Sequence, residues 1–107
     1  MSEESEAKRD GAKTQPNSGR GKHKKGDAIL GPFLIDYKEY ASSFGVSIGV
    51  WAKLSKDAII KGNKQPALKL VLGKEDQPKV RLWVIGDEQF HEMLRAWERE
   101  TSGEDYE

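Results

Sequence analysis

The sequence predicts an α+β (α/β) protein in which a small central mixed β-sheet is flanked by helices, and three observations predict this class. Four short apolar segments are typical of strands. Two longer segments repeat apolar residues at helical spacing, and the order along the chain is strand, strand, helix, strand, strand, helix. The 107 residues fit one small domain, which we expect to span residues 18–99.

Four strands are expected. The first two, at residues 27–30 and 33–38, lie on either side of Gly31-Pro32, a pair that marks a turn. The next two are the apolar runs at residues 67–72 and 79–85, which are joined by the polar connection GKEDQP. Because apolar runs are typical of strands covered on both sides, we expect these later strands to be buried on both faces.

Two helices are expected, each with its own capping residue. Ser47 can cap the first helix, and the pair Gly62-Asn63 is a favourable end for it. Asp87 can cap the second helix. The apolar residues at helical spacing are Trp51, Leu54 and Ala58 in the first helix, and Phe90, Met93, Leu94 and Trp97 in the second.

The two ends of the chain differ in composition from the middle. Residues 1–17 are polar and lack apolar periodicity, so we expect them to be disordered, with at most a frayed helical turn over Glu3 to Lys8. Residues 18–26 form a basic run, and residues 100–107 form an acidic tail. Lys plus Arg and Asp plus Glu each total 18, so a net charge of zero hides an uneven distribution.

Composition excludes several classes of protein. The absence of cysteine excludes disulfides and thiolate metal sites, and suits a reducing cytoplasm. His23 and His91 are far apart in the sequence, which argues against a structural zinc site. No apolar run reaches the roughly 18 residues of a membrane span, and the N-terminus lacks the apolar segment of a secretory signal. We therefore expect a cytoplasmic protein without a membrane partner.

Two aspartates interrupt the first two expected strands. If the turn is centred on Gly31-Pro32, Asp27 lies opposite Asp36, and their Cβ atoms are then roughly 4.5 to 5.5 Å apart. Lys38 follows Asp36 by two residues and therefore projects from the same face. This register predicts two carboxylates and an ammonium group in one small area of the sheet.

A divalent cation is one way to offset the repulsion between two such carboxylates. Mg²⁺ takes oxygen ligands, usually one or two carboxylates together with waters and a phosphate. With Lys38 placed to orient a water and pair with the phosphate, the arrangement suits metal-assisted hydrolysis of a phosphodiester. The alternative is that Asp36 and Lys38 form an ordinary ion pair on an exposed strand.

The residues around these aspartates resemble a known superfamily. Gly26-Asp27, eight residues, and then Asp36-Tyr37-Lys38 resemble the PD-(D/E)xK nucleases, in which an acid on one strand is followed by acid, any residue and lysine on the next. NSGRGKHKKGDAIL is similar to the serine-glycine loop of archaeal and phage Holliday-junction resolvases. WAKLSKDAIIKGNKQPALKLVL and RLWVIGDEQFHEML resemble their later helices and strands, so the resemblance covers roughly residues 15–95.

The resemblance implies a restriction-endonuclease-like core and a metal-dependent endodeoxyribonuclease that acts on branched DNA in recombination. Its reaction would be Holliday-junction resolution by attack of a metal-activated water on a phosphodiester, with Mg²⁺ or Mn²⁺ as cofactor. A homodimer is implied as well, located in the host cytoplasm if the chain is phage-encoded. By the family pattern Asp27 and Asp36 are metal ligands, Lys38 is the catalytic lysine, and Ser18 lies near the scissile phosphate.

The chain departs from the family pattern at two places. Its second acid is Asp36, where the superfamily more often has Glu. The family also has an N-terminal helix with a further Glu, and here that helix is expected to be short or missing. Glu3, Glu4 and Glu6 are the candidates for a third carboxylate. These departures concern catalysis more than fold.

A basic segment directly precedes Asp27 and predicts DNA contacts. A cationic segment beside a metal site can follow a phosphate backbone, and would recognise shape rather than bases. Lys53, on the first expected helix, can touch the backbone too, although a solvated charged surface is the alternative. The expected DNA-binding residues are Arg20, Lys22, His23, Lys24, Lys25 and Lys53.

Two other functions stay open at this point. The same fold suits a non-catalytic DNA-binding or regulatory protein in which Asp27 and Asp36 have no catalytic use. It also suits a protein-interaction module whose acidic tail recruits a partner. Metal binding separates the nuclease from both, and salt-sensitive DNA binding separates the second function from the third.

Overall fold

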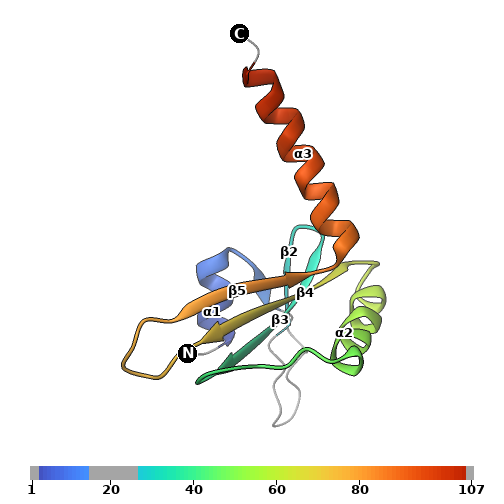
Figure 1. Ribbon diagram of the computed structural model, residues 1–107. Helices are drawn as coiled ribbons and strands as arrows, with labels where there is room; N and C mark the ends of the chain where they lie inside the picture. Colours follow the sequence, from blue (N-terminus) through green and yellow to red (C-terminus); the bar gives the residue numbers. More distant parts are fainter. Residues whose placement is uncertain (1–2, 15–26, 106–107) are drawn as a thin grey trace.

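The computed structural model describes residues 3–14 and 27–105 of the chain. These residues form a five-stranded mixed sheet in the order β1-β2-β3-β4-β5 together with three helices, which confirms the predicted α+β class (Figure 1). The strands are β1 (Lys13–Thr14), β2 (Ala28–Leu30), β3 (Phe33–Tyr40), β4 (Gln65–Leu72) and β5 (Val80–Ile85). The helices are α1 (Glu3–Asp10), α2 (Ile48–Ile60) and α3 (Asp87–Asp105).

The hairpin of β2 and β3 has the register that the turn residues predict. The strands are antiparallel, with Leu30 opposite Phe33. Gly31 has a φ of +58°, and the ring of Pro32 fixes a negative φ at the next position, a combination that excludes a type I′ turn and fits type II′. Continuing the pairing by one residue beyond β2 brings Asp27 across from Asp36.

The unit β3–α2–β4 joins two parallel strands through a helix that crosses one face of the sheet. The hydroxyl of Ser47 accepts a hydrogen bond from the backbone N–H of Val50 at 3.1 Å, so the predicted cap is confirmed. The predicted end is confirmed too, because Gly62 and Asn63 take φ values of +105° and +56°. Both ends of α2 are therefore set by local sequence.

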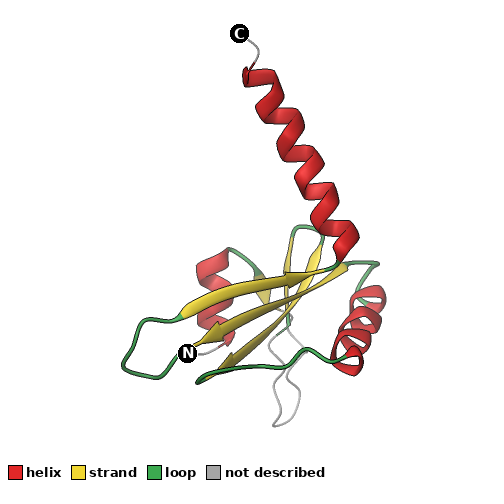
Figure 2. Ribbon diagram, in the orientation of Figure 1, coloured by secondary structure: helices red, strands yellow, loops and turns green. Residues whose placement is uncertain are grey.

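The helices α1 and α2 lie on opposite faces of the sheet (Figure 2), and each packs over its own apolar core. Alternate residues of β3 point to opposite faces, so Leu34 packs under α2 and Ile35 packs under α1. The α2-face core is Leu34, Leu54, Ala58, Leu68 and Leu70. The α1-face core is Ala7, Ala28, Ile35, Tyr37 and Ala67.

The prediction that both later strands are buried on both faces is confirmed for β4 and wrong for β5. In β4 five successive residues are buried, whereas Val80, Leu82 and Trp83 of β5 are 54%, 45% and 45% exposed. β5 is an edge strand, α2 lies over β3 and β4, and α3 points away from the sheet (Figure 1). Among the described residues, no helix covers the β5 side chains Val80, Leu82 and Trp83, so these side chains stay partly exposed.

The prediction that residues 1–17 are disordered is wrong for residues 3–14, which form α1 and β1. β1 pairs with β2, and Thr14 lies opposite Ala28. Residues 1–2 and 15–17 lie outside the described part of the chain. α1 is very polar and docks through ion pairs to distant strands, a kind of stabilisation that gives no apolar periodicity in its own sequence.

The last helix also differs from its predicted bounds. α3 begins at Asp87, so that Asp87 is its first residue rather than its cap, and it continues to Asp105 through most of the acidic tail. None of the helices in the described ranges is both long and apolar enough to cross a membrane.

Candidate functional site

A small cavity of about 130 Å³ on the α2 face brings together four of the predicted site residues, Asp27, Asp36, Lys38 and Lys53. Asp27 and the β3 residues Asp36 and Lys38 form its sheet side. Asp36 and Lys38 point to the α2 face because they follow Leu34 at intervals of two along the strand. The helix side of the cavity is formed by Val50, Lys53, Leu54 and Asp57.

Asp36 and Lys38 form an open ion pair at the cavity. Lys38 Nζ lies 3.4 Å from Asp36 Oδ2, and the two side chains are 32% and 23% exposed. Lys38 Nζ also lies 5.8 Å from the centre of the Phe44 ring, which offers a weak cation–π contact. Because neither group is buried, both can exchange this pairing for a ligand at modest cost.

Asp57 is a cavity residue that the sequence reasoning missed. It belongs to α2, lies 3.5 Å from Lys53 Nζ one helical turn earlier, and is 38% exposed. A signal existed, since Val50, Lys53, Leu54 and Asp57 follow the spacing of a single helix face. That face carries the buried Leu54, so the acid and the lysine flank an inward-facing position.

A metal ion at this cavity would depend on two carboxylates. Within residues 3–14 and 27–105, no three acidic or histidine side chains converge into a metal-ligand group. Asp27 and Asp36 line one cavity and offer the hard oxygen donors that Mg²⁺ prefers, with its remaining positions left for water and phosphate. The donor set present therefore fits a Mg²⁺ or Mn²⁺ site with few protein ligands.

Glu6, one candidate for a third carboxylate, lies on the other face of the sheet. Its Oε2 is 2.9 Å from Lys69 Nζ and 2.9 Å from Arg81 Nε, and the residue is only 3% exposed. Burial alone would raise the pKa of Glu6, but hydrogen bonds from Arg81 and Lys69 outweigh it and hold that pKa below the ordinary value of 4.5. Glu6 is thus committed to docking α1 and does not reach the cavity.

The same buried cluster includes two further polar groups. Lys69 Nζ donates to both carboxylate oxygens of Asp10, at 2.7 and 2.9 Å, and lies 5.1 Å from the centre of the Trp83 ring. Tyr37 donates its hydroxyl proton to Asp10 Oδ2 at 3.1 Å. Burial and the neighbouring Asp10 raise the pKa of Tyr37, so the phenol stays protonated. We call Glu6, Asp10, Tyr37, Lys69 and Arg81 the α1 cluster.

Most of the predicted DNA contacts are not placed by the structure. Lys53 is placed, at the rim of the cavity, with a side chain that is 65% exposed. The side chains of Glu3 and Glu4 are not among those described. The remaining predicted residues lie outside the described part of the chain: Ser18, Arg20, Lys22, His23, Lys24 and Lys25.

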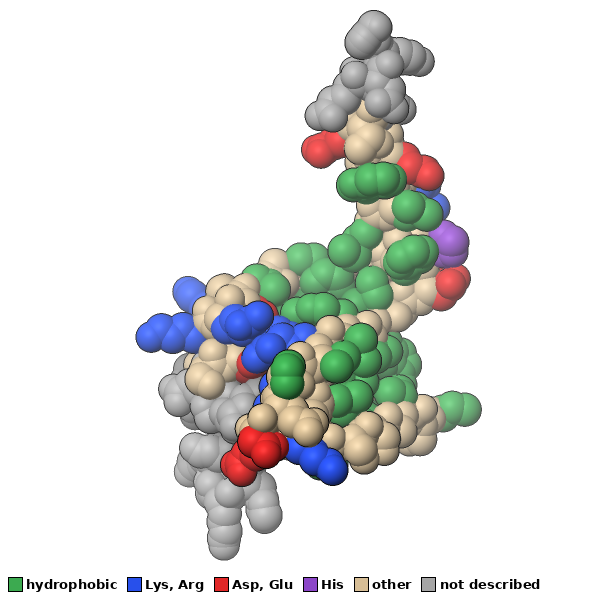
Figure 3. Space-filling view, turned by 60° about the vertical axis from the view of Figure 1, so that its left-hand side comes forward, with side chains coloured by type: hydrophobic (Ala, Val, Ile, Leu, Met, Phe, Trp, Pro, Cys, Tyr) green, Lys and Arg blue, Asp and Glu red, His purple; other side chains and the backbone are tan. Residues whose placement is uncertain are grey.

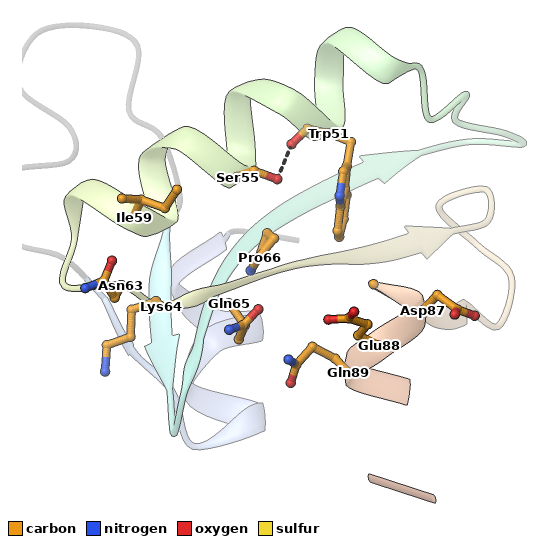
Figure 4. A pocket seen from close by; sticks show the side chains of 11 residues that line it. Trp51, Ser55, Ile59, Asn63, Lys64, Gln65, Pro66, Asp87, Glu88 and Gln89 are labelled. Carbon is orange, nitrogen blue, oxygen red and sulfur yellow. Dashed lines mark hydrogen bonds between the residues drawn. The ribbon is translucent and has the colours of Figure 1, made fainter. Parts of the chain in front are cut away.

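A larger groove of about 550 Å³ separates α2 from the start of α3 (Figure 4). The ring of Trp51 projects from α2 into this groove, near Pro66 of β4. The hydroxyl of Ser55 donates to the carbonyl oxygen of Trp51 at 2.8 Å and is therefore occupied within its own helix. The groove is also lined by Lys64, Asp87 and Glu88, and the ammonium group of Lys64 donates to the carbonyl oxygen of Gly31 at 3.4 Å.

The fold and the small cavity together define an α+β domain with two acids and a lysine at the junction of a hairpin and a helix. No family model matches the chain, and no match is found among curated proteins or among solved structures. Any function for this chain therefore has to be argued from its own residues.

Proposed function

We propose that the protein is a metal-dependent endodeoxyribonuclease that acts on branched DNA, most specifically on four-way Holliday junctions. One observation carries the proposal: Asp27, Asp36 and Lys38 line the same small cavity, in the hairpin register that the sequence predicts. The branched substrate comes from the resemblance to PD-(D/E)xK resolvases, and the location in the cytoplasm comes from the absence of cysteine. The metal-assisted hydrolysis is argued from the cavity residues Asp27, Asp36 and Lys38.

Each residue has a separate task in this proposal. Asp27 and Asp36 hold the divalent cation, which would neutralise the phosphate and lower the pKa of a coordinated water. Lys38 releases Asp36 and turns its ammonium group to the scissile phosphate, a short movement because the present pair is 3.4 Å long and open to solvent. Lys53, at the rim, contacts the DNA backbone.

The basic residues 18–26 belong to the same proposal because they lead directly into Asp27. A cationic segment that adjoins a cavity acid in the sequence can follow a phosphate backbone. Contacts from lysine and arginine to phosphates release counterions, so binding should weaken steeply as salt rises. By the resemblance to the resolvases, Ser18 would lie near the scissile phosphate.

A second candidate is a non-catalytic DNA-binding or regulatory protein on the same fold. The observation that favours it is the lack of a third converging ligand among the described residues, together with the commitment of Glu6 to the α1 cluster. In this candidate the ion pair of Asp36 and Lys38 is permanent. The basic segment would then bind DNA without cleavage.

The test is cleavage of a synthetic four-way junction in Mg²⁺, in Mn²⁺ and in EDTA, with linear duplex and flap controls. Asp36→Asn and Lys38→Met should each reduce the rate by about a thousandfold, which corresponds to about 4 kcal/mol of transition-state stabilisation. The matched controls are Asp76→Asn and Lys74→Met, because both residues are exposed in the β4–β5 connection. These controls should cleave like the original protein.

The outcomes separate the candidates. Metal-dependent paired incisions that disappear in the cavity variants support the nuclease. Equal cleavage of all substrates keeps the nuclease and rejects junction specificity. Tight, salt-sensitive junction binding without cleavage in either metal supports the non-catalytic candidate and rejects our proposal.

A further inference from the structure

β5 has an outer edge that no other strand among the described residues occupies. It is the last strand of the sheet, and all of Val80–Ile85 pairs with β4 on the inner side. In an antiparallel pair, every second residue turns its backbone N–H and C=O groups away from the partner strand. These outward groups of β5 can therefore pair with a further strand, and Figure 1 shows β5 (orange) as the outermost strand of the sheet.

The two edges of the sheet differ in how they are protected against such pairing. Natural edge strands are usually short, charged or interrupted by proline. β1 follows this rule, because it has two residues and one of them is Lys13. β5 has six residues and no proline, and its one charged residue is Arg81, whose Nε lies 2.9 Å from Glu6 Oε2 on the α1 face. β5 is thus the edge of this sheet that can accept another strand.

Apolar side chains extend from both faces of this edge. Val80 and Leu82 lie on the α2 face, because Leu82 pairs with Leu70 of the α2-face core, and both are about half exposed. Trp83 pairs with Lys69 and so lies on the α1 face, where it too is about half exposed. Figure 3 shows hydrophobic side chains extending from α3 down across one face of the body. A strand with apolar side chains at alternate positions would cover this area.

Charged residues at one end of the edge indicate which strand would fit. Asp87 and Glu88 come directly after β5, and both are exposed and line the groove that also holds the ring of Trp51 (Figure 4). Two carboxylates and an indole ring attract an ammonium or guanidinium group. Lys64 lines the same groove, but its side chain points away from these acids (Figure 4). The groove therefore complements a basic side chain.

We propose that the outer edge of β5 binds an extended peptide of another protein, which adds a strand antiparallel to β5. The peptide has apolar side chains at alternate positions and a lysine or arginine at its N-terminal end. In an antiparallel pair this end lies at the C-terminal end of β5, so the basic side chain reaches Trp51, Asp87 and Glu88. Main-chain hydrogen bonds supply the affinity, and the side chains supply the selectivity.

Binding of a synthetic peptide tests the proposal without reference to the nuclease activity, because none of the cavity residues takes part. The probe is a fluorescent peptide of about seven residues, in which lysine is followed by alternating valine and threonine. Fluorescence anisotropy with the full-length protein should give a Kd of about 1–100 μM, and no binding up to about 1 mM overturns the proposal. A peptide with glutamate in place of the lysine should bind about five- to tenfold more weakly.

Backbone methylation separates strand addition from simple apolar contact. Two further peptides carry N-methyl groups on alternate residues, one peptide for each of the two alternating sets. Strand addition uses the N–H groups along one edge of the peptide only. One methylated peptide should therefore lose at least about tenfold in affinity, whereas the other should bind like the parent peptide. Equal affinities of the two methylated peptides overturn the arrangement.

Variants of the protein test the two parts of the contact. Asp87→Asn combined with Glu88→Gln lies outside both cores and should remove the preference for lysine over glutamate. Leu82→Lys should weaken binding of the parent peptide by at least about tenfold, because the added strand would bury the new charge. The matched control is Ile48→Lys at an exposed position of α2, which should bind like the original protein. Circular dichroism checks the fold of each variant, and a preference for lysine that persists in the double variant overturns the basic end of the proposal.

Sedimentation with and without the peptide identifies a competing occupant of the edge. We expect the peptide to bind without changing the number of protein copies in the sedimenting particle. A peptide that binds only by dissociating a dimer would assign the outer edge of β5 to a second copy of the chain, and would overturn the proposal.

Discussion

The two faces of the sheet use the same kinds of charged residue in opposite ways. On the α1 face Glu6 and Lys69 are 3% and 2% exposed, and every contact between Lys69 and its two acids is shorter than 3 Å. On the α2 face Asp36 and Lys38 lie 3.4 Å apart with about a quarter to a third of each side chain in solvent. The first arrangement is closed, and the second is open.

The difference teaches where a ligand can bind. A buried ion pair has lost its hydration, so removing one partner leaves a charge that nothing else can satisfy. An exposed pair keeps water nearby and can exchange its partner for a metal ion or a phosphate at modest cost. In the sequence, all of these residues are simply lysines and acids on expected strands and helices. Only their burial in the folded protein distinguishes the structural groups from those that can bind a ligand.

The largest effect is expected when the same substitution is made on each face. Lys69→Met leaves Glu6 and Asp10 without their common cation, and should lower the free energy of unfolding by about 3 to 5 kcal/mol. Lys38→Met removes a partner whose side chain is about one third exposed, and should change the free energy of unfolding by less than about 0.5 kcal/mol. Urea unfolding measures both values, and similar losses at the two positions would contradict the comparison.

Acid should affect the closed face more than the open one. The pKa of Glu6 is lower in the folded protein than its ordinary value of 4.5, so the stability it contributes is fully present above about pH 4.5. That stability is lost as the pH falls through the lowered pKa, because the unfolded chain then binds the proton more readily. We expect stability to fall with acid in that window.

Glu6→Gln should flatten this acid dependence, whatever its effect on stability at neutral pH. Glu75→Gln, in the exposed β4–β5 connection, is the matched control and should leave the slope unchanged. Urea unfolding at a series of pH values gives both slopes. A slope that persists in Glu6→Gln would assign the acid sensitivity to other groups.

The smallest expected effect concerns Asp57, the cavity acid on α2. It lines the cavity but is 38% exposed and already paired with Lys53, so its field at the ion is screened. Asp57→Asn should weaken Mn²⁺ binding by about two- to fivefold, whereas Asp36→Asn should abolish it. Calorimetric titration measures both affinities. Equal losses would make Asp57 a direct ligand, and Asp76→Asn serves as the control.

Local signals predicted the parts of the fold and site that local physics determines. The turn residues Gly31-Pro32 gave the hairpin register, and with it the approach of Asp27 to Asp36. The cap at Ser47 and the end of α2 followed from the preferences of single residues. Each of these features depends on atoms only a few positions away in the chain.

The missed features depend on distant partners. α1 docks through Asp10 and Glu6, whose partners Lys69 and Arg81 are 59 and 75 positions away. The N-terminal sequence therefore indicates at most a frayed helical turn and does not indicate a docked helix. The exposure of β5 depends on the direction that α3 takes at the end of the sheet, which the apolar pattern of the strand does not encode. Asp57 was overlooked because the solvated-helix interpretation of α2 ignored which side its acid faces.

The short strand β1 has a consequence for the chain that follows it. Because Thr14 is paired with Ala28, the stretch between them starts and finishes at neighbouring points of the sheet, directly beside Asp27. The entropy of closing a loop grows only with the logarithm of its length, so doubling such a connection costs about 0.6 kcal/mol. Lengthening the connection between Thr14 and Ala28 should therefore cost little folding free energy, because the paired strands still fix both of its ends.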